Sequence, residues 1–327
     1  MEKNLSIFSF KKGPYGFIIV LSIILLLESA IWIFDDHFPH GVYGMVLRYK
    51  NDLARKKNNN YDILILGDCY PATGIEPDII QEKTGLTGFN FSGAADTTIL
   101  FGYVVFSNYL KSSPPPKYLI ISYLPQTIYY HEKYIQHYLL PYFYHYRQGN
   151  LMPLFKEFGF KQGLLYAIPS LGYQSLLKKG IFMDQFWVKD RNQNIIDENF
   201  GHDGYVTAFE EGTYTEDIQG KVSKINFPES SFYKKYFIKI LDLAQKNDVT
   251  VYYIIPTVPK DYYAIYKNSG LVEHIHQHLQ SWKEKYPNLT VLDPQSIINE
   301  KSFYADRLHM NRSGSRQLSH FLADTLL

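Results

Sequence analysis

Cysteine is almost absent from this sequence, in which Cys69 is the only one. An intrachain disulfide and a zinc site built from several cysteines are therefore excluded. Net charge is almost absent too, because 33 basic and 32 acidic side chains leave a formal charge of +1. A chain without a positive field does not concentrate a phosphate backbone, which argues against a general nucleic-acid binder. A lone cysteine has either a packing role or a chemical one.

Glycine-rich phosphate loops are also missing. The first strand-to-helix turn of the chain carries neither a Gly-x-Gly-x-x-Gly pattern nor a Gly-Lys-Ser sequence. These patterns let backbone N–H groups surround phosphate groups at the start of a helix. A cytoplasmic nucleotide-binding protein of the flavodoxin-like kind is therefore disfavoured.

Long hydrophobic runs are scarce, which excludes a polytopic membrane protein. The one such run covers residues 13–34, GPYGFIIVLSIILLLESAIWIF, and its only formal charge is Glu28. As a helix it would be roughly 33 Å long, the thickness of a bilayer core. We expect a retained membrane anchor with a short cytoplasmic tip, residues 1–36. A cleaved signal peptide is the alternative, but no small-x-small site ends the run.

The rest of the chain predicts an α/β domain. Short apolar runs of the kind found in buried parallel strands lie at 61–67, 88–91, 117–124, 249–256 and 289–294. Helical patterns lie between or after them at 76–85, 97–109, 230–248, 271–286 and 312–326. Right-handed crossovers then give a three-layer α/β sandwich with a parallel sheet of about five strands.

Three parts of this chain do not follow that alternation. Residues 37–60 end in the polar stretch ARKKNNN, and we interpret them as a linker. The domain then covers residues 61–327, and residues 127–229 form a large insertion or cap within it. The insertion is rich in tyrosine. Its tyrosines could stack on sugar rings, but the helical spacing of Tyr130, Tyr134 and Tyr138 favours packing for at least half of them.

Residues able to do chemistry follow the first and last strands. Gly67-Asp68-Cys69 comes directly after the first strand, and Asp306-Arg307-Leu308-His309 comes after the last. Ligands of open parallel sheets bind beyond the carboxyl ends of the strands, so these segments share one edge. An Asp and a His three residues apart can place the imidazole against a nucleophile. We therefore expect Cys69, His309 and Asp306 to converge.

These motifs resemble a known family. GDCYPATGI, GFNFSGAAD and ADRLHMNRSG are similar to segments of the SGNH (GDSL-type) hydrolase superfamily. The similarity is greatest to its membrane-anchored acyltransferase-like branch, with the teichoic-acid D-alanyl transfer and alginate acetylation proteins. The resemblance covers about 61–126 and 230–327. It implies an SGNH/flavodoxin-like fold with Cys69 as nucleophile, His309 as base and Asp306 as the acid that orients it.

The resemblance also implies an oxyanion hole. Its donors would be the backbone N–H of Cys69, a backbone N–H at Ser92 or Gly93, and a side-chain amide from Asn90 or Gln126. Asp68, next to the nucleophile, belongs to the same predicted oxyanion and substrate-binding group.

This chain departs from the family at one position, because Cys69 stands where the family normally has serine. A thiol there is consistent with a catalytic thioester, with a lineage that has lost hydrolysis, or with a deliberate change. A thioester remains activated toward a sugar alcohol, which suits transfer better than hydrolysis.

The predicted function is therefore an extracytoplasmic O-acyltransferase that modifies a cell-surface glycan or polymer through a Cys69 thioester. By resemblance, a polytopic membrane O-acyltransferase partner would supply the acyl group. We predict no cofactor, no metal and no nucleic-acid partner. An O-acyl esterase with the same site is an alternative, and so is a non-catalytic binding or assembly subunit of a polymer-modification complex.

The charges around the apolar run predict a single-span topology with the N-terminus inside. Lys3, Lys11 and Lys12 precede the run and Asp35 and Asp36 follow it, and basic residues favour the cytoplasmic side. Protease added outside spheroplasts should therefore digest the domain. Full protection of the domain in intact spheroplasts, with digestion after lysis, would reverse this topology.

Overall fold

The five predicted strands all form, and they pair into one parallel sheet. The computed structural model describes residues 15–33, 42–93, 99–125, 159–161, 201, 203–206 and 230–327. In it the strands are β1 (Ile63–Gly67), β2 (Gly88–Asn90), β3 (Tyr118–Ser122), β4 (Thr250–Ile254) and β5 (Leu289–Leu292). Their order across the sheet is β2-β1-β3-β4-β5, and every neighbouring pair is parallel. All the strands therefore end at the same edge.

The middle of the sheet is buried on both faces, as short apolar runs predict. All five residues of β1 are buried, and four of the five residues of β3 are. Side chains alternate between faces along a strand, so each face needs its own layer of helices.

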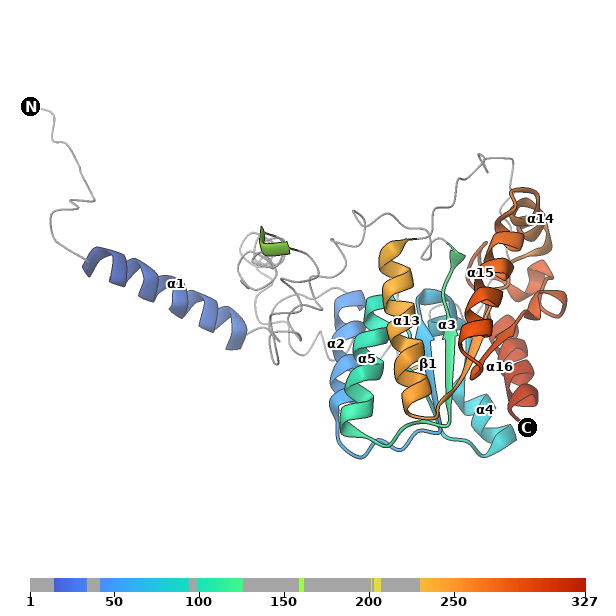
Figure 1. The fold of residues 1–327 in the computed structure, drawn as a ribbon, viewed down its shortest axis with the longest axis horizontal. Helices are drawn as coiled ribbons and strands as arrows, with labels where there is room; N and C mark the ends of the chain where they lie inside the picture. Colours follow the sequence, from blue (N-terminus) through green and yellow to red (C-terminus); the bar gives the residue numbers. More distant parts are fainter. Residues whose placement is uncertain are drawn as a thin grey trace, which may run out of the picture. The chain divides into compact units, whose positions relative to one another are not determined.

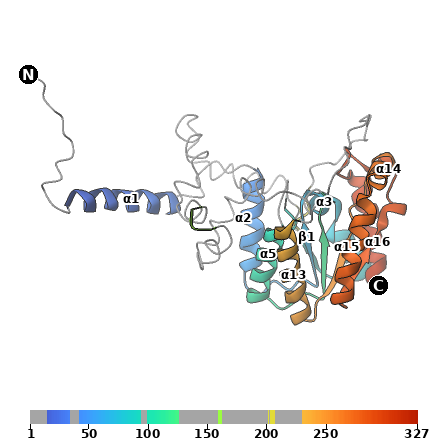
Figure 2. The ribbon, with the colours of Figure 1, turned by 45° about the horizontal axis from the view of Figure 1, so that its top comes forward.

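Helices supply those two layers (Figures 1 and 2). One layer contains α2 (Val42–Arg55), α5 (Ile99–Ser112), α13 (Ser231–Lys246) and α15 (Leu271–Lys285); the other contains α3 (Cys69–Gly74), α4 (Pro77–Thr84) and α16 (Arg312–Leu326). The helix α14 (Lys260–Asn268) packs on α15 near the carboxyl end of the sheet, and two 3-10 turns, η3 (Pro294–Ser296) and η4 (Lys301–Phe303), follow β5. The structure confirms an α/β fold with a five-stranded parallel sheet.

Buried tyrosines account for part of the aromatic excess. The tyrosines that are at most 2% exposed lie in the core of the domain: Tyr70, Tyr109, Tyr123, Tyr233, Tyr236, Tyr253, Tyr286 and Tyr304. Each buries a large apolar ring and needs a partner for its hydroxyl. The predicted aromatic cluster at 130, 134 and 138 lies outside the described residues.

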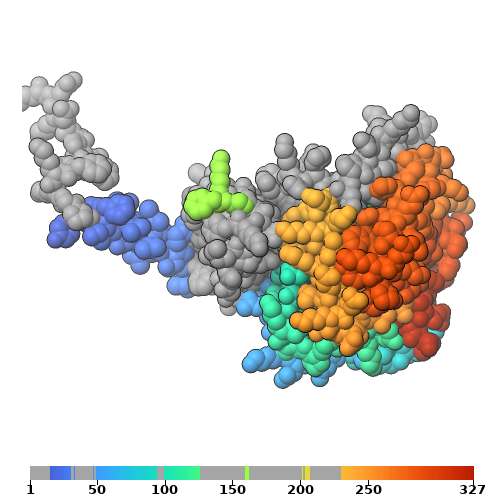
Figure 3. Space-filling view, viewed as in Figure 1, coloured from blue at the N-terminus to red at the C-terminus, as the bar shows by residue number. Residues whose placement is uncertain are grey.

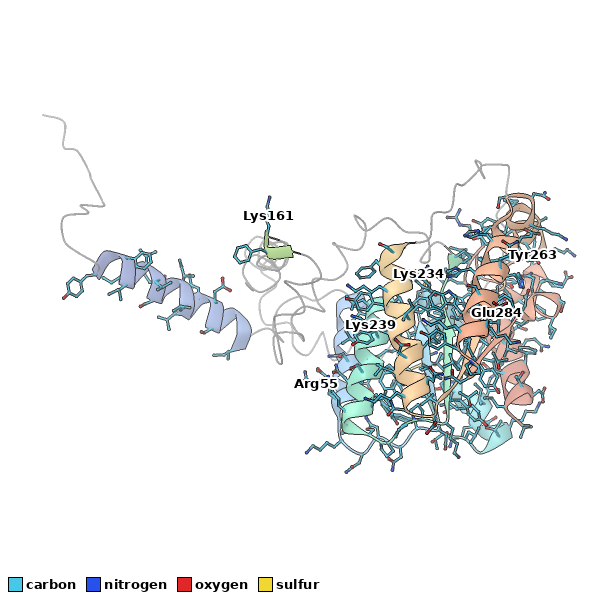
Figure 4. The ribbon with its side chains drawn as sticks, in the orientation of Figure 1. Arg55, Lys161, Lys234, Lys239, Tyr263 and Glu284 are labelled. Carbon is cyan, nitrogen blue, oxygen red and sulfur yellow. The ribbon has the colours of Figure 1, made fainter. Side chains whose placement is uncertain are left out.

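Aromatic rings also join α13 to its neighbours. Phe237 on α13 packs edge-to-face on Trp282 of α15 at 5.7 Å between ring centroids, and Figure 3 shows these two helices side by side. On the other side of α13, the ammonium of Lys239, labelled in Figure 4, lies 5.2 Å from the ring of Tyr103 on α5. Ring and cation–π contacts therefore hold this helical layer together.

The predicted linker at 37–60 is wrong. Residues Val42–Arg55 form α2, which packs on α5 through a hydrogen bond from Asn108 to Asn51 (3.0 Å) and another from Ser112 to the carbonyl of Ala54 (2.7 Å). The basic and polar residues at the end of this segment led to the linker prediction, although apolar residues precede them. A polar composition does not exclude a helix that buries one face.

The first apolar run forms the helix α1 (Tyr15–Ile33), and its apolar side chains are exposed. Its 19 residues make it about 28 Å long, and Glu28 interrupts its apolar surface. No helix in the described ranges is long and apolar enough to cross a membrane. The structure therefore does not support the predicted transmembrane anchor.

Most of the predicted insertion at 127–229 lies outside the described residues. Within it, the structure describes the short segments 159–161, 201 and 203–206. The segment 203–206 is tied to the sheet by a hydrogen bond from the backbone N–H of Asn90 to the carbonyl of Asp203 (2.8 Å).

Gly67, at the end of β1, has no room for a side chain. A Cβ at this position would collide with the carbonyl oxygen of Ser122 on β3 and with the ring of Pro71. Gly67→Ala should therefore lower the free energy of unfolding by about 3 kcal/mol or more, measured by urea denaturation.

Gly74→Ala is the matched control. Its added Cβ would meet nothing closer than the sulfur of Met310 at 3.7 Å. This substitution should be neutral or stabilising by up to about 1 kcal/mol, because alanine favours the helix. Equal effects of the two substitutions would contradict the close approach at Gly67.

Candidate active site

Cys69 is the first residue of the helix α3 and follows the end of β1 by two residues. The intervening Asp68 caps the helix, since its Oδ1 accepts a hydrogen bond from the backbone N–H of Tyr70 at 3.0 Å. Cys69 itself is only partly buried. The strand end and the cap thus fix the backbone of the thiol while leaving the side chain accessible.

The structure brings Cys69, His309 and Asp306 together as predicted. The Nε2 atom of His309 lies 3.1 Å from the Sγ atom of Cys69, although 240 residues separate them. On the other side of the ring, Nδ1 of His309 lies 2.8 Å from Oδ2 of Asp306. The three groups therefore form a chain in the order thiol, imidazole, carboxylate, which is the order a nucleophile, base and orienting acid require.

A tight turn holds the Asp-x-x-His segment. Oδ1 of Asp306 accepts hydrogen bonds from the backbone N–H groups of Leu308 (2.7 Å) and His309 (2.8 Å). The ends of the turn pair through an antiparallel bridge between Tyr304 and Met310, and both of these side chains are buried. These contacts therefore fix the backbone from which the His309 side chain extends.

The electrostatics of this turn favour an ionised carboxylate. Partial burial acts to raise the pKa of Asp306, but the hydrogen bonds from the ring of His309 and from the two backbone N–H groups outweigh it, so the pKa lies below its usual value. An ionised Asp306 accepts a hydrogen bond from the Nδ1–H group of His309. Nε2 is then the lone-pair nitrogen, able to take the proton of the Cys69 thiol.

A buried hydroxyl cluster connects the nucleophile turn to the His309 turn. The Tyr70 hydroxyl lies 2.9 Å from Oγ1 of Thr257 and accepts a hydrogen bond from the Thr257 backbone N–H, also at 2.9 Å. The Tyr304 hydroxyl lies 2.9 Å from the same Oγ1 atom. Burial raises the pKa of both tyrosines above the usual value, so both stay neutral. The cluster keeps two segments that are distant in sequence at a fixed separation.

Asp68 has a structural role, in contrast to its predicted place among the oxyanion and substrate-binding residues. Its carboxylate is 1% exposed. One oxygen caps α3, and the other accepts a hydrogen bond from the backbone N–H of Leu124 at 2.7 Å. Both oxygens are therefore engaged by the backbone.

The predicted oxyanion donors at the end of β2 are also engaged within the protein. The Asn90 amide donates to the carbonyls of Pro71 (2.7 Å) and Ile75 (2.9 Å), which uses both of its hydrogens. The Ser92 backbone N–H donates to the Asn90 side chain, and the Gly93 backbone N–H donates to the carbonyl of Gly67. In this structure each of these donors therefore has an acceptor within the protein, and their role in binding an oxyanion stays a prediction.

The Cys69 backbone N–H is the predicted donor that stays compatible with an oxyanion hole. It belongs to the first residue of α3, and its role as an oxyanion donor stays a prediction. Gln126 lies outside the described residues. The buried Ser92 hydroxyl has no hydrogen-bond partner among the described residues, and it lies near the turn.

Lys50 is the main residue of this region that the sequence interpretation missed. It is fully buried in α2, and its ammonium donates to the carbonyls of Ser92 (2.7 Å) and Gly204 (2.8 Å). The buried face of α2 combines the apolar Leu47 and Ala54 with the polar Lys50 and Asn51, so hydrophobic periodicity alone does not indicate that Lys50 is buried.

No group of three or more His, Cys, Asp or Glu side chains that could hold a metal occurs in the part of the chain that the structure covers.

Comparisons with known proteins show little. No family's sequence model matches this chain, and no curated protein does. A solved structure provisionally named as a platelet activating factor from Streptococcus pneumonia is 12% identical, with a TM-score of 0.43; the match covers 94% of this chain and 99% of that one.

The Asp306 contacts predict a pH-dependent contribution to stability. A depressed carboxyl pKa stabilises the fold above its unfolded value and loses this effect as pH falls through the folded value. Asp306→Asn should therefore lower the free energy of unfolding by about 1 kcal/mol at pH 6, a figure kept small because water screens the site.

The same substitution should cost progressively less as pH falls through the folded pKa of Asp306, which lies below its usual value, because the wild-type carboxyl then becomes protonated. Urea denaturation of both proteins at pH 6 and pH 2 measures the two differences, and the acid pair serves as the control. An equal cost at both pH values would contradict an ionised Asp306 in the folded protein.

Proposed function

We propose that this protein is an enzyme of the SGNH type that transfers or hydrolyses an O-acyl group through Cys69. The observation that carries the proposal is the chain of contacts from the Cys69 thiol through the His309 ring to the Asp306 carboxylate. The thiol is partly exposed and can meet a substrate, while the ring is held by a carboxylate with a depressed pKa.

The proposed reaction has two steps, acylation of Cys69 and transfer of the acyl group to an acceptor. Nε2 of His309 takes the thiol proton as Sγ of Cys69 attacks the acyl carbonyl carbon, and the imidazolium then gives that proton to the departing oxygen. A thioester remains on Cys69. In the second step Nε2 takes a proton from an acceptor hydroxyl, the acceptor oxygen attacks the thioester carbon, and the thiolate leaves and is reprotonated.

The thiol favours transfer to an alcohol over hydrolysis, because a thioester is an activated acyl donor. In this proposal the acceptor is a hydroxyl of a cell-surface glycan or polymer, and the acyl group is small, such as acetyl. Water as the acceptor would make the same site an esterase. The developing oxyanion would be stabilised by the Cys69 backbone N–H, which begins α3.

The location and partners of the enzyme are proposals as well. The proposal keeps the apolar run 13–34 as a membrane anchor, which the structure does not show; the lysines before it and the acidic residues after it would then orient the domain outside the cytoplasm. No acyl-CoA is expected there, so a polytopic membrane O-acyltransferase is the proposed source of the acyl group. This partner comes from the family resemblance alone.

The decisive test is the formation of an acyl-enzyme. Full-length protein incubated with p-nitrophenyl acetate should gain the mass of one acetyl group on Cys69, and neutral hydroxylamine should remove it, because hydroxylamine cleaves thioesters readily. Cys69→Ala should show no adduct. His309→Ala should acylate at least about tenfold more slowly, because a thiol with its ordinary pKa near 8.5 is mostly protonated at neutral pH.

Cys69→Ser is the matched variant, because it changes only the nucleophilic atom. It should fold and keep only part of the activity, since a hydroxyl needs a stronger base than a thiol does. Release of acetate without transfer to any glycan would favour the esterase. Full cellular function of Cys69→Ala would instead identify a non-catalytic binding or assembly subunit.

A further inference from the structure

Lys50 is a buried cation whose contacts lead to the nucleophile turn. The side chain is 0% exposed, and a lysine is almost never fully buried without partners for its charge. Burial lowers the pKa of Lys50 to about 7, while the nearby Asp203 acts in the opposite direction. An apolar side chain of similar size would avoid this desolvation cost, and such replacements are often neutral or stabilising.

One contact of Lys50 is linked, through the Ser92–Gly93 peptide, to Gly67, two residues before Cys69. The ammonium donates to the carbonyl of Ser92 at 2.7 Å. That carbonyl belongs to the same peptide group as the Gly93 N–H, which donates to the carbonyl of Gly67 at 2.9 Å. The Ser92–Gly93 peptide is thus clamped between Lys50 and the end of β1, two residues before the thiol. Hydrogen bonds in such a chain polarise and strengthen one another.

The other contact of Lys50 reaches the helix after Cys69. The ammonium donates to the carbonyl of Gly204 at 2.8 Å. Gly204 has a φ of 80°, and a Cβ there would collide with the Asn90 carbonyl. Two residues later the Val206 backbone N–H donates to the carbonyl of Ala72 in α3, at 3.0 Å. The segment 203–206 therefore lies against both the end of β2 and the nucleophile helix.

We propose that Lys50 is a positioning residue for the Cys69 nucleophile. By holding the Ser92 and Gly204 carbonyls it fixes the chain on both sides of the thiol, at Gly67 and at Ala72, and so maintains the 3.1 Å contact between Sγ and the His309 ring. The inference rests on the nucleophilic role proposed for Cys69. It adds that α2, which precedes the first strand, supplies one side chain, Lys50, that positions the nucleophile turn.

The test uses Cys69 as its own reporter, because it is the only cysteine in the chain. The rate constant for alkylation by iodoacetamide is measured on the full-length protein from pH 5 to pH 9. Lys50→Met keeps the length of the side chain but removes its donors. It should slow alkylation at pH 7 by about tenfold and move the midpoint of the pH profile up toward about 8.5, the value of an ordinary thiol.

Asn51→Leu is the matched control. Asn51 is the next residue of α2, is 2% exposed, and accepts a hydrogen bond from Asn108 of α5. Its replacement perturbs the packing of the same helix without touching Ser92 or Gly204. Thermal unfolding of all variants measures the loss of stability. Asn51→Leu should lower the melting temperature and leave the alkylation rate within about twofold of wild type.

The outcomes separate the two proposals. If wild type alkylates fast and folded Lys50→Met is as fast, the positioning role is wrong, and it is equally wrong if Asn51→Leu slows the thiol as much. If Lys50→Met does not fold, Lys50→Leu, which also removes the donors, is measured instead, and an unchanged rate overturns the role. If wild type itself alkylates like an ordinary thiol and His309→Ala changes nothing, the nucleophile proposal fails, and this inference fails with it.

Discussion

The buried carboxylate of Asp68 is the interaction on which the candidate site depends. It joins the end of β1 to the end of β3 through the backbone N–H of Leu124, and it caps the helix that starts with Cys69. A buried carboxylate is costly unless donors surround it, and here both oxygens have a donor. Asp68 therefore fixes the turn between the end of β1 and the start of α3, and with it the position of the Cys69 backbone.

Around this carboxylate, close backbone approach replaces side-chain packing. Gly67 lies against the carbonyl of Ser122 without space for a Cβ, and its own carbonyl accepts the Gly93 N–H. The buried Tyr70, Thr257 and Tyr304 hydroxyls then connect this turn to the segment that carries His309. The short contact between thiol and imidazole thus depends on buried hydrogen bonds of Asp68 and of these hydroxyls, which fix the two turns, as preorganised sites require.

The number of strands and their parallel direction could be predicted from the sequence, because short apolar runs alternate with amphipathic helices. The convergence of Cys69 and His309 followed from the rule that parallel strands share a carboxyl edge. The hydrogen-bond partners of Asn90, Ser92 and Gly93 could not be predicted, because the sequence does not show whether an N–H group points into the protein or toward a substrate. The burial of Lys50 was not predicted, because the polar composition of residues 37–60 was interpreted as a linker and not as a helix with one buried face.

The separation of 240 residues between Cys69 and His309 also has a consequence for the newly made chain. The β1–α3 turn can form from local contacts, but the imidazole reaches the thiol only after β4, β5 and the His309 turn have joined the sheet. Closing so long a loop comes late, because its entropy must be overcome before the contact forms. If Cys69 is the nucleophile proposed above, its activation by His309 must therefore wait until the fold is complete.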